Sequence, residues 1–233
     1  MTRLIWLAGL LAGAGCGLIS SDVADFDLSL PEREVRVDTA DWELADMSQL
    51  PAVDCTGELE GVCATSVGEY CGAEDVCAGA CGGDDTCEVW IAVSLWHTFD
   101  LAAERPELEQ IEGQPLVEVS IDRVSYEITE NTLNVPSPPL VVYVAPEGVM
   151  SPADAQAQAI GTIPPIEPGV RVAEAEVELT EDGKAHLAER MKQYSTPFNL
   201  IVASDVVLRA GDPLPSGVLV ATVKATAKAS TGL

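Results

Sequence analysis

The recurrence of aliphatic residues at every second position is the feature that most limits how this chain can fold. The clearest examples are the segments 89–96 and 173–179, in which every second residue is aliphatic. A period of two places alternate side chains on opposite faces of a β-strand, whereas a helix needs a period of 3.6. In 173–179 the other positions are glutamates, which must face water. The chain is therefore expected to be mainly β.

Further strand patterns extend through the whole chain, at 26–30, 35–37, 117–128, 140–144, 199–208 and 218–227. Within 117–128 the apolar phase shifts, so we expect a β-bulge at Asp122 or Arg123, where one extra residue resets the alternation. The segment 140–144 is apolar throughout, which is typical of a strand buried on both faces.

Helical patterns are few. Thr180 suits a helix N-cap, and Leu187, Met191 and Tyr194 then recur at helical spacing until Pro197 prevents continuation. A second short helical turn is compatible with 152–160. Strands at turn-separated intervals with one short helix predict an antiparallel β-sandwich, immunoglobulin-like or jelly-roll-like. An up-and-down barrel is the alternative.

Six of the seven cysteines cluster in one segment: Cys55, Cys63, Cys71, Cys77, Cys81 and Cys87. No two of them are separated by only two residues and the segment contains no histidine, so a zinc ribbon or knuckle does not fit. An even set in an exported chain predicts three disulfides, with the pairing left open. The segment, at about 52–88, is rich in glycine and acids. We therefore expect an insertion in the sandwich that is held by cross-links instead of a core of its own.

The N-terminus has the pattern of a secretory signal. Arg3 precedes an apolar run over 4–15 that is too short to span a bilayer as a stable helix. The following box, Gly13-Ala14-Gly15-Cys16, resembles the lipobox of bacterial lipoproteins, with Gly13 where that family usually has leucine.

The lipoprotein resemblance implies a signal peptide over 1–15, removed to leave acyl chains on Cys16. It also implies anchoring in the outer membrane, because Gly17 follows the cysteine instead of the aspartate that often retains the family in the inner membrane. We then expect a lipidated tether over 16–25 and a β-sandwich domain over 26–233. Whether the domain faces the periplasm or the cell surface stays open.

Two other interpretations of Cys16 are open. Residues 12–14, Ala-Gly-Ala, also have the small-x-small pattern of an ordinary cleavage site, which would release a secreted, soluble protein. Cys16 could instead be an unpaired thiol. The cysteine count favours the anchor, because assigning Cys16 to lipid leaves an even number of cysteines to pair.

The charge of the chain is extreme. Twelve Lys and Arg against 38 Asp and Glu give a formal net charge of −26. Such a field repels nucleic acid and anionic lipid headgroups, so no nucleic-acid partner is expected. The acidity suits solubility on a crowded surface. Calcium binding is the alternative, with Asp84, Asp85 and the stretch 22–27 as candidate ligands, although neither has the spaced EF-hand pattern.

Catalytic motifs are absent from the sequence. It contains no nucleophile elbow, zinc-protease helix, phosphate loop or dinucleotide fingerprint. The two histidines, His97 and His186, are expected to be packed or surface residues. No catalytic residue and no cofactor are therefore expected.

The aromatic residues divide into two groups. Trp90, Trp96, Tyr126 and Tyr143 lie in apolar strands and are expected in the sandwich core, with a sugar-binding face as the alternative. Trp42 lies in a less apolar stretch and is expected to be exposed.

The sequence thus predicts an exported, lipid-anchored protein of the cell envelope with a structural or interaction role and no catalysis. Its partners would be the membrane, through the lipid, and a protein or glycan at the cell surface. One alternative is a carbohydrate- or calcium-binding module. A second is a hydrolase that uses two of the many acidic residues.

Overall fold

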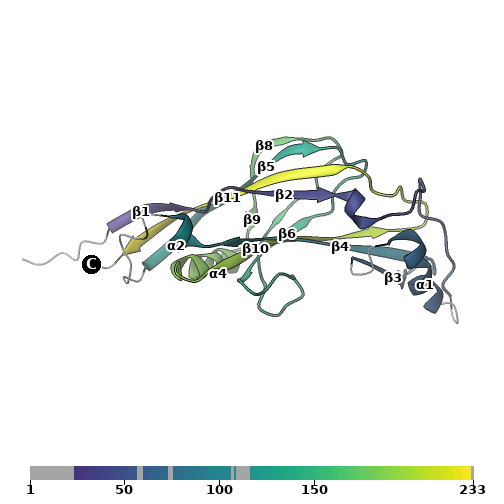
Figure 1. The fold of residues 1–233 in the computed structure, drawn as a ribbon, viewed down its shortest axis with the longest axis horizontal. Coiled ribbons are helices and arrows are strands. Elements are labelled where there is room, and N and C mark those ends of the chain that lie inside the picture. The colour runs from purple at the N-terminus through teal and green to yellow at the C-terminus, as the bar shows by residue number, and fades with distance from the viewer. Residues whose placement is uncertain (1–23, 57–59, 73–75, 106–107, 109–115, 232–233) are drawn as a thin grey trace, which may run out of the picture.

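The computed structural model describes residues 24–56, 60–72, 76–105, 108 and 116–231. They form two antiparallel β-sheets in an elongated sandwich (Figure 1). The first sheet contains β1 (Ala24–Ser29), β2 (Arg33–Asp38), β5 (Leu116–Asn131), β8 (Val172–Glu176) and β11 (Val218–Thr231). The second has the order β3 (Cys77–Cys81), β4 (Cys87–Phe99), β10 (Phe198–Leu208), β6 (Leu140–Pro146), β7 (Gln158–Ile163) and β9 (Glu178–Leu179). The mainly β sandwich expected from the alternation is confirmed.

The long strand β11 organises the first sheet. It pairs with β5 on one side and with β1 and then β2 on the other. Ala24 lies opposite Thr231, so the first and last described strands run together to the same end of the molecule (Figure 1). The start of β1 at Ala24 places the last two residues of the expected tether, 24 and 25, in the sheet.

The β-bulge expected in 117–128 is confirmed. Ile121 pairs with Ala227 and Arg123 pairs with Thr226, which leaves Asp122 as the extra residue. The bulge resets the phase, so that Ile121 before it and Val124 after it both point into the core.

The main hydrophobic core lies between the two sheets. Ile128 and Val223 from the first sheet meet Val142, Val144 and Phe198 from the second. Strand β6 is fully buried only on its inner face, at Val142 and Val144, whereas Val141 and Tyr143 on its outer face are half-buried, so the expected burial of 140–144 on both faces is only partial. The following residue of the outer face, Ala145, is buried in a smaller cluster. No cysteine belongs to the main core cluster.

The helix α4 (Glu181–Lys192) begins as the sequence predicted. The Thr180 hydroxyl accepts a hydrogen bond from the Gly183 amide at 2.9 Å. Leu187 and Met191 are fully buried, and the helix packs against β5 of one sheet and β7 of the other. It therefore covers one side of the sandwich, where the two sheets would otherwise leave the core open.

Two predictions about local structure are wrong. Residues 152–160 form hydrogen-bonded turns followed by β7, because the segment crosses the outside of a sheet, where tertiary packing decides its shape. The alternating segment 173–179 is not one strand: β8 pairs with β5 in the first sheet, whereas β9 pairs with β7 in the second. Val177 is buried where the chain passes between the sheets.

More helix is present than expected. Besides α4, the described residues include η1 (Thr39–Trp42), α1 (Glu60–Tyr70) and α2 (Leu101–Glu104). The helix α1 lies within the cysteine segment, where a composition of glycine, threonine and valine hides any helical pattern. With β3 it forms one extreme of the molecule, opposite the end where β1 begins (Figure 1). We call residues 52–88 the tip.

The close approach of α4 to β7 is testable with a pair of helical glycines. A Cβ at Gly183 would overlap the backbone of Ile160, whereas one at Gly68 in α1 would meet open space. Gly183→Ala should lower the free energy of unfolding by about 1–3 kcal/mol. Gly68→Ala should leave it unchanged or raise it by up to about 1 kcal/mol. Urea titration followed by circular dichroism measures both, and equal effects would contradict this packing.

Candidate functional site

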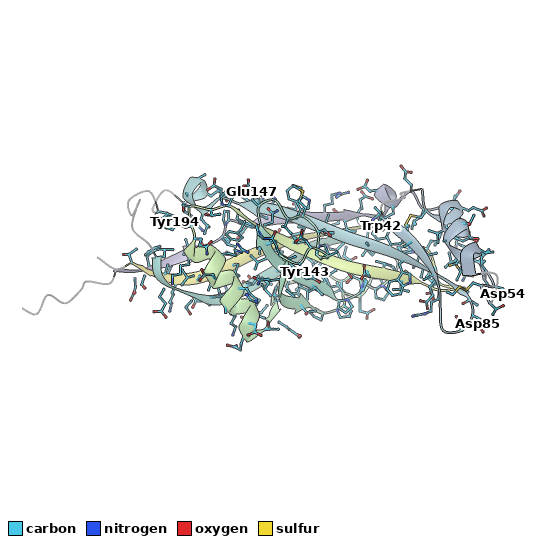
Figure 2. All side chains as sticks on the ribbon, turned by 90° about the horizontal axis from the view of Figure 1, so that it is seen from below. Trp42, Asp54, Asp85, Tyr143, Glu147 and Tyr194 are labelled. Atoms are coloured by element: carbon cyan, nitrogen blue, oxygen red, sulfur yellow. A yellow bond between two sulfur atoms is a disulfide. The ribbon has the colours of Figure 1, made fainter. Side chains whose placement is uncertain are left out.

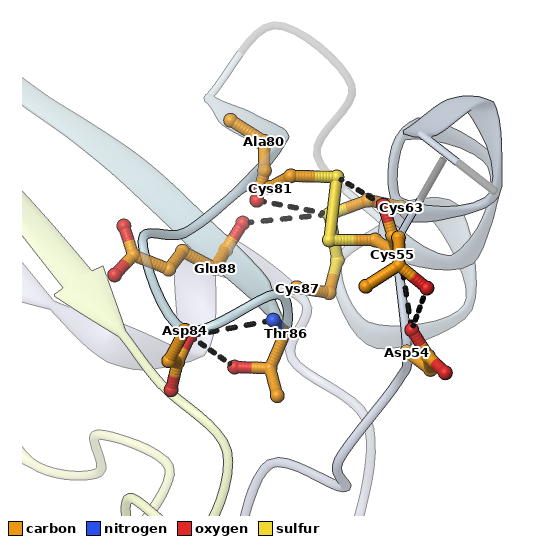
Figure 3. Close-up of a disulfide and its surroundings, with 10 residues drawn as sticks. Asp54, Cys55, Cys63, Ala80, Cys81, Asp84, Thr86, Cys87 and Glu88 are labelled. Atoms are coloured by element: carbon orange, nitrogen blue, oxygen red, sulfur yellow. Dashed lines mark hydrogen bonds between the residues drawn. A yellow bond between two sulfur atoms is a disulfide. The ribbon is translucent and has the colours of Figure 1, made fainter. Parts of the chain in front are cut away.

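All six cysteines of the tip are paired. The disulfides are Cys55–Cys81, Cys63–Cys87 and Cys71–Cys77, with Cα–Cα distances of 5.8, 5.3 and 6.3 Å. Cys63–Cys87 ties α1 to β4, and Cys55–Cys81 ties the segment that enters the tip to β3 (Figure 3). Cys71–Cys77 joins the residue after α1 to β3. Three disulfides indicate an oxidising, extracytoplasmic compartment.

The tip has more of a core than its composition predicted. Val67 and Tyr70 of α1 pack with Trp42, Leu50 and Ile91 in a hydrophobic cluster separate from the main core. Trp42 is therefore not the exposed aromatic residue we expected, because only 8 % of it is accessible. The short helix η1 turns its ring inward immediately after β2. Cross-links and this small cluster hold the tip together.

One of the two candidate calcium ligands in the tip, Asp84, has a protein partner. Asp84 accepts hydrogen bonds from the Thr86 hydroxyl and amide, at 2.7 and 3.3 Å (Figure 3). These bonds hold the pKa of Asp84 below its usual value, and Asp54 is held low in the same way by Thr56. Asp85 adopts a left-handed backbone (φ 63°) beside Asp84. Within the described part of the chain, no group of three or more metal-ligating side chains is close enough to hold an ion.

Two tryptophans expected in the core lie on the surface instead. Trp90 is 40 % and Trp96 is 45 % exposed, whereas Val89 and Ile91 of the same strand are buried. The alternation predicts the strand β4 correctly. Its aliphatic side chains face the interior, and its two tryptophans face solvent. Of the other two aromatics, Tyr126 is in the core as predicted, and Tyr143 is half-buried on the outer side of β6.

We call the outward surface of β4 and its neighbour β10 the tryptophan face. It consists of Trp90, Ala92, Ser94 and Trp96 of β4 together with Asp205 and Val207 of β10. In the antiparallel register Val207 lies opposite Trp90, and Asp205 lies opposite Ala92. Because residues opposite each other share one side of the sheet, these six side chains share the outer surface.

A loop over residues 147–157 borders the tryptophan face. Asn199, which is fully buried, donates hydrogen bonds to the carbonyl oxygens of Glu147 and Val149, both at 2.8 Å. The Ser94 hydroxyl donates to the Met150 carbonyl at 3.4 Å, so the loop is also tied to β4. Met150 is 48 % exposed at this border. Figure 2 shows Tyr143 and Glu147 in the middle of the molecule, between Tyr194 at one end and Asp54 and Asp85 at the tip.

Positive charge is distributed unevenly between the sheets. The six strands of the second sheet contain no lysine or arginine, and neither does the loop that borders the tryptophan face. The strands of the first sheet contain five: Arg33, Arg36, Arg123, Lys224 and Lys228. Arg209, which follows β10, is paired with Glu88 at 2.8 Å.

The histidines are packed or surface residues, as expected. His97 is half-buried and its ring meets the edge of Phe99, with 5.6 Å between centroids. Burial lowers the pKa of His97, and the positive charge of Arg33 lowers it further, partly offset by Glu104. Arg33 also pairs with Glu104 at 2.5 Å and lies over the Phe99 ring, so this cluster links β2 of one sheet to β4 of the other. His186 is half-buried on α4.

Acidic residues in the described part of the chain all lie at least partly in solvent. No Asp or Glu there is buried, and the buried polar residues are serine, threonine and asparagine. A glycoside hydrolase needs one carboxylic acid whose pKa is raised, usually by an apolar surrounding. None of the carboxylates whose burial the structure describes is buried in an apolar surrounding.

The disulfides of the tip should support the tip alone, because the main core contains no cysteine. Replacing Cys63 and Cys87 together by serine should destabilise the tip locally by about 3 kcal/mol. Amide exchange should then accelerate in α1 and β3 and stay slow in β5, β6 and β11. The Cys71–Cys77 disulfide closes a shorter loop than Cys63–Cys87 does. Replacing both Cys71 and Cys77 by serine should therefore destabilise the tip by about 1 kcal/mol less. Loss of protection throughout the sandwich would contradict this separation.

Cys16 and the proposed signal lie outside the described residues, so the lipidation site stays a prediction. Among the described residues, none of the helices combines the length and hydrophobicity needed to cross a bilayer. No protein-family model matches the chain, and no curated protein shows significant sequence similarity to it.

Proposed function

We propose that this chain is an exported protein of the bacterial cell envelope, anchored in the outer membrane through lipid on Cys16, with a structural or interaction role and no catalysis. The observation that carries the proposal is the pairing of the six other cysteines. Those disulfides form in an oxidising compartment, and they leave Cys16, in its lipobox-like context, as the one cysteine without a structural task.

The shape of the molecule supports an anchored role. The described chain begins at Ala24, at the end opposite the tip (Figure 1). Ala24 is eight positions after Cys16, and a fully extended segment of that length reaches at most about 28 Å. A domain held by so short a tether would stay near the bilayer at its β1 end and carry the tip away from it.

The net charge of −26 supports the same orientation. An acidic domain is repelled by anionic headgroups, so it would not lie flat on the membrane. Stable attachment then depends on the lipid, and one acyl chain alone gives only marginal binding. The several acyl chains of a mature lipoprotein would supply the additional membrane affinity that stable attachment requires.

Anchoring is tested by fractionation and fatty-acid labelling in a bacterial host. Wild-type protein should sediment with the outer membrane and incorporate an alkyne-labelled fatty acid, whereas Cys16→Ala should do neither. The double variant Cys55→Ser, Cys81→Ser is the matched control, because it removes cysteines yet should still be labelled. Unlabelled wild-type protein in the soluble fraction would contradict the proposal and favour ordinary cleavage after residues 12–14.

A further inference from the structure

The tryptophan face has large apolar side chains that stay exposed to solvent. Trp90, Trp96 and the bordering Met150 are three of the five large hydrophobic residues that are exposed in the described part of the chain. Trp96 is six positions after Trp90 along β4, which corresponds to about 20 Å between them. Exposed tryptophans gathered on one face indicate a binding surface.

The side chains between the two rings are small. Ala92 and Ser94 are both exposed, with the loop 147–157 tied to Ser94 through Met150. The neighbouring Asp205 lies opposite Ala92, between the two rings along the strand and nearer to Trp90. The Asp205 side chain is exposed, and its carboxylate forms no hydrogen bond or ion pair with any residue that the structure describes. Its carboxylate can therefore accept hydrogen bonds from a ligand.

We propose that the tryptophan face binds a neutral glycan chain lying along β4. A sugar ring has an apolar face of C–H groups, which can stack on an indole ring, and an edge of hydroxyls, which can donate to a carboxylate. Trp90 and Trp96 would hold two sugar rings of one chain, and Asp205 would accept hydrogen bonds from the rings between them.

The charge of the protein favours a neutral glycan over a charged one. The second sheet lacks lysine and arginine, and the nearby Arg209 is already paired with Glu88. A chain with a net charge of −26 repels acidic polysaccharides, nucleic acid and anionic lipid alike. An uncharged polymer is not repelled by the negative charge, and its recognition does not require lysine or arginine side chains.

The dimensions of the surface favour a glycan over a protein. A stable protein interface buries about 800 Å² on each partner, usually around a broad apolar centre. The exposed apolar side chains here follow one strand, with the loop 147–157 on one side. A narrow line of this kind fits an extended chain better than a globular surface. A second copy of this acidic protein would also be repelled.

This inference names a partner for the interaction role proposed above and rests on that role only for its biological setting. Its test uses purified full-length protein in a detergent whose headgroup contains no sugar. Cellohexaose, chitohexaose and maltohexaose are titrated separately, with tryptophan fluorescence and calorimetry as readouts. At least one should bind saturably, with an affinity that does not change between low and high salt. Failure of anchoring would leave this result unaffected.

Variants assign the binding to the face. Trp90→Ala and Trp96→Ala should each weaken binding at least about tenfold, and Asp205→Asn should weaken it less. Val170→Ala is the control, because Val170 is 44 % exposed but lies outside the face. Thermal unfolding should be near wild type for all four variants, since each side chain is exposed.

Three outcomes would overturn the proposal. The first is no saturable binding of any of the three hexasaccharides. The second is binding that survives both tryptophan substitutions. The third is tryptophan-dependent binding of hexalysine alone, lost at high salt, which would assign the face to a cationic protein partner.

Discussion

The antiparallel ladders of β11 are the interaction on which the rest of the structure depends. This strand pairs along its length with β5 on one side, and with β1 and β2 in turn on the other. Its 14 residues span about 45 Å, which sets the long axis of the sandwich. Because β1 runs beside the end of β11, the described chain begins at one extreme of the domain. The inner faces of the two sheets enclose the main core.

The two ends of that axis are stabilised by different physics. The sandwich buries aliphatic side chains between its sheets and under α4, without any cysteine. The tip has only a small cluster around Trp42 and is held mainly by three cross-links. Between the ends, the tryptophan face runs along the outside of β4. The β1 end, where we propose attachment, the cross-linked tip and the tryptophan face are therefore separate parts of one elongated domain.

Local signals were predictable from the sequence, and choices made by tertiary packing were not. The bulge at Asp122 and the cap at Thr180 depend on a few neighbouring residues, so their patterns were sufficient. The alternation in β4 assigned its side chains to two faces of the strand, but both faces contain apolar residues. Packing against the opposing sheet decides which face is buried, and it leaves Trp90 and Trp96 facing solvent. Alternation also continues unbroken through Val177, where the chain changes sheets. The disulfide pairing depends on how α1 packs, which the composition of the tip concealed.

The central claim is that the seven cysteines divide into one anchor and three cross-links, at opposite ends of one domain. Peptide mass mapping of the mature protein without reduction tests both parts in one measurement. The account predicts an N-terminal peptide that begins at Cys16 with added acyl mass, and linked peptides joining Cys55 to Cys81, Cys63 to Cys87 and Cys71 to Cys77. An unmodified N-terminus, or Cys16 linked to any cysteine of the tip, would contradict it.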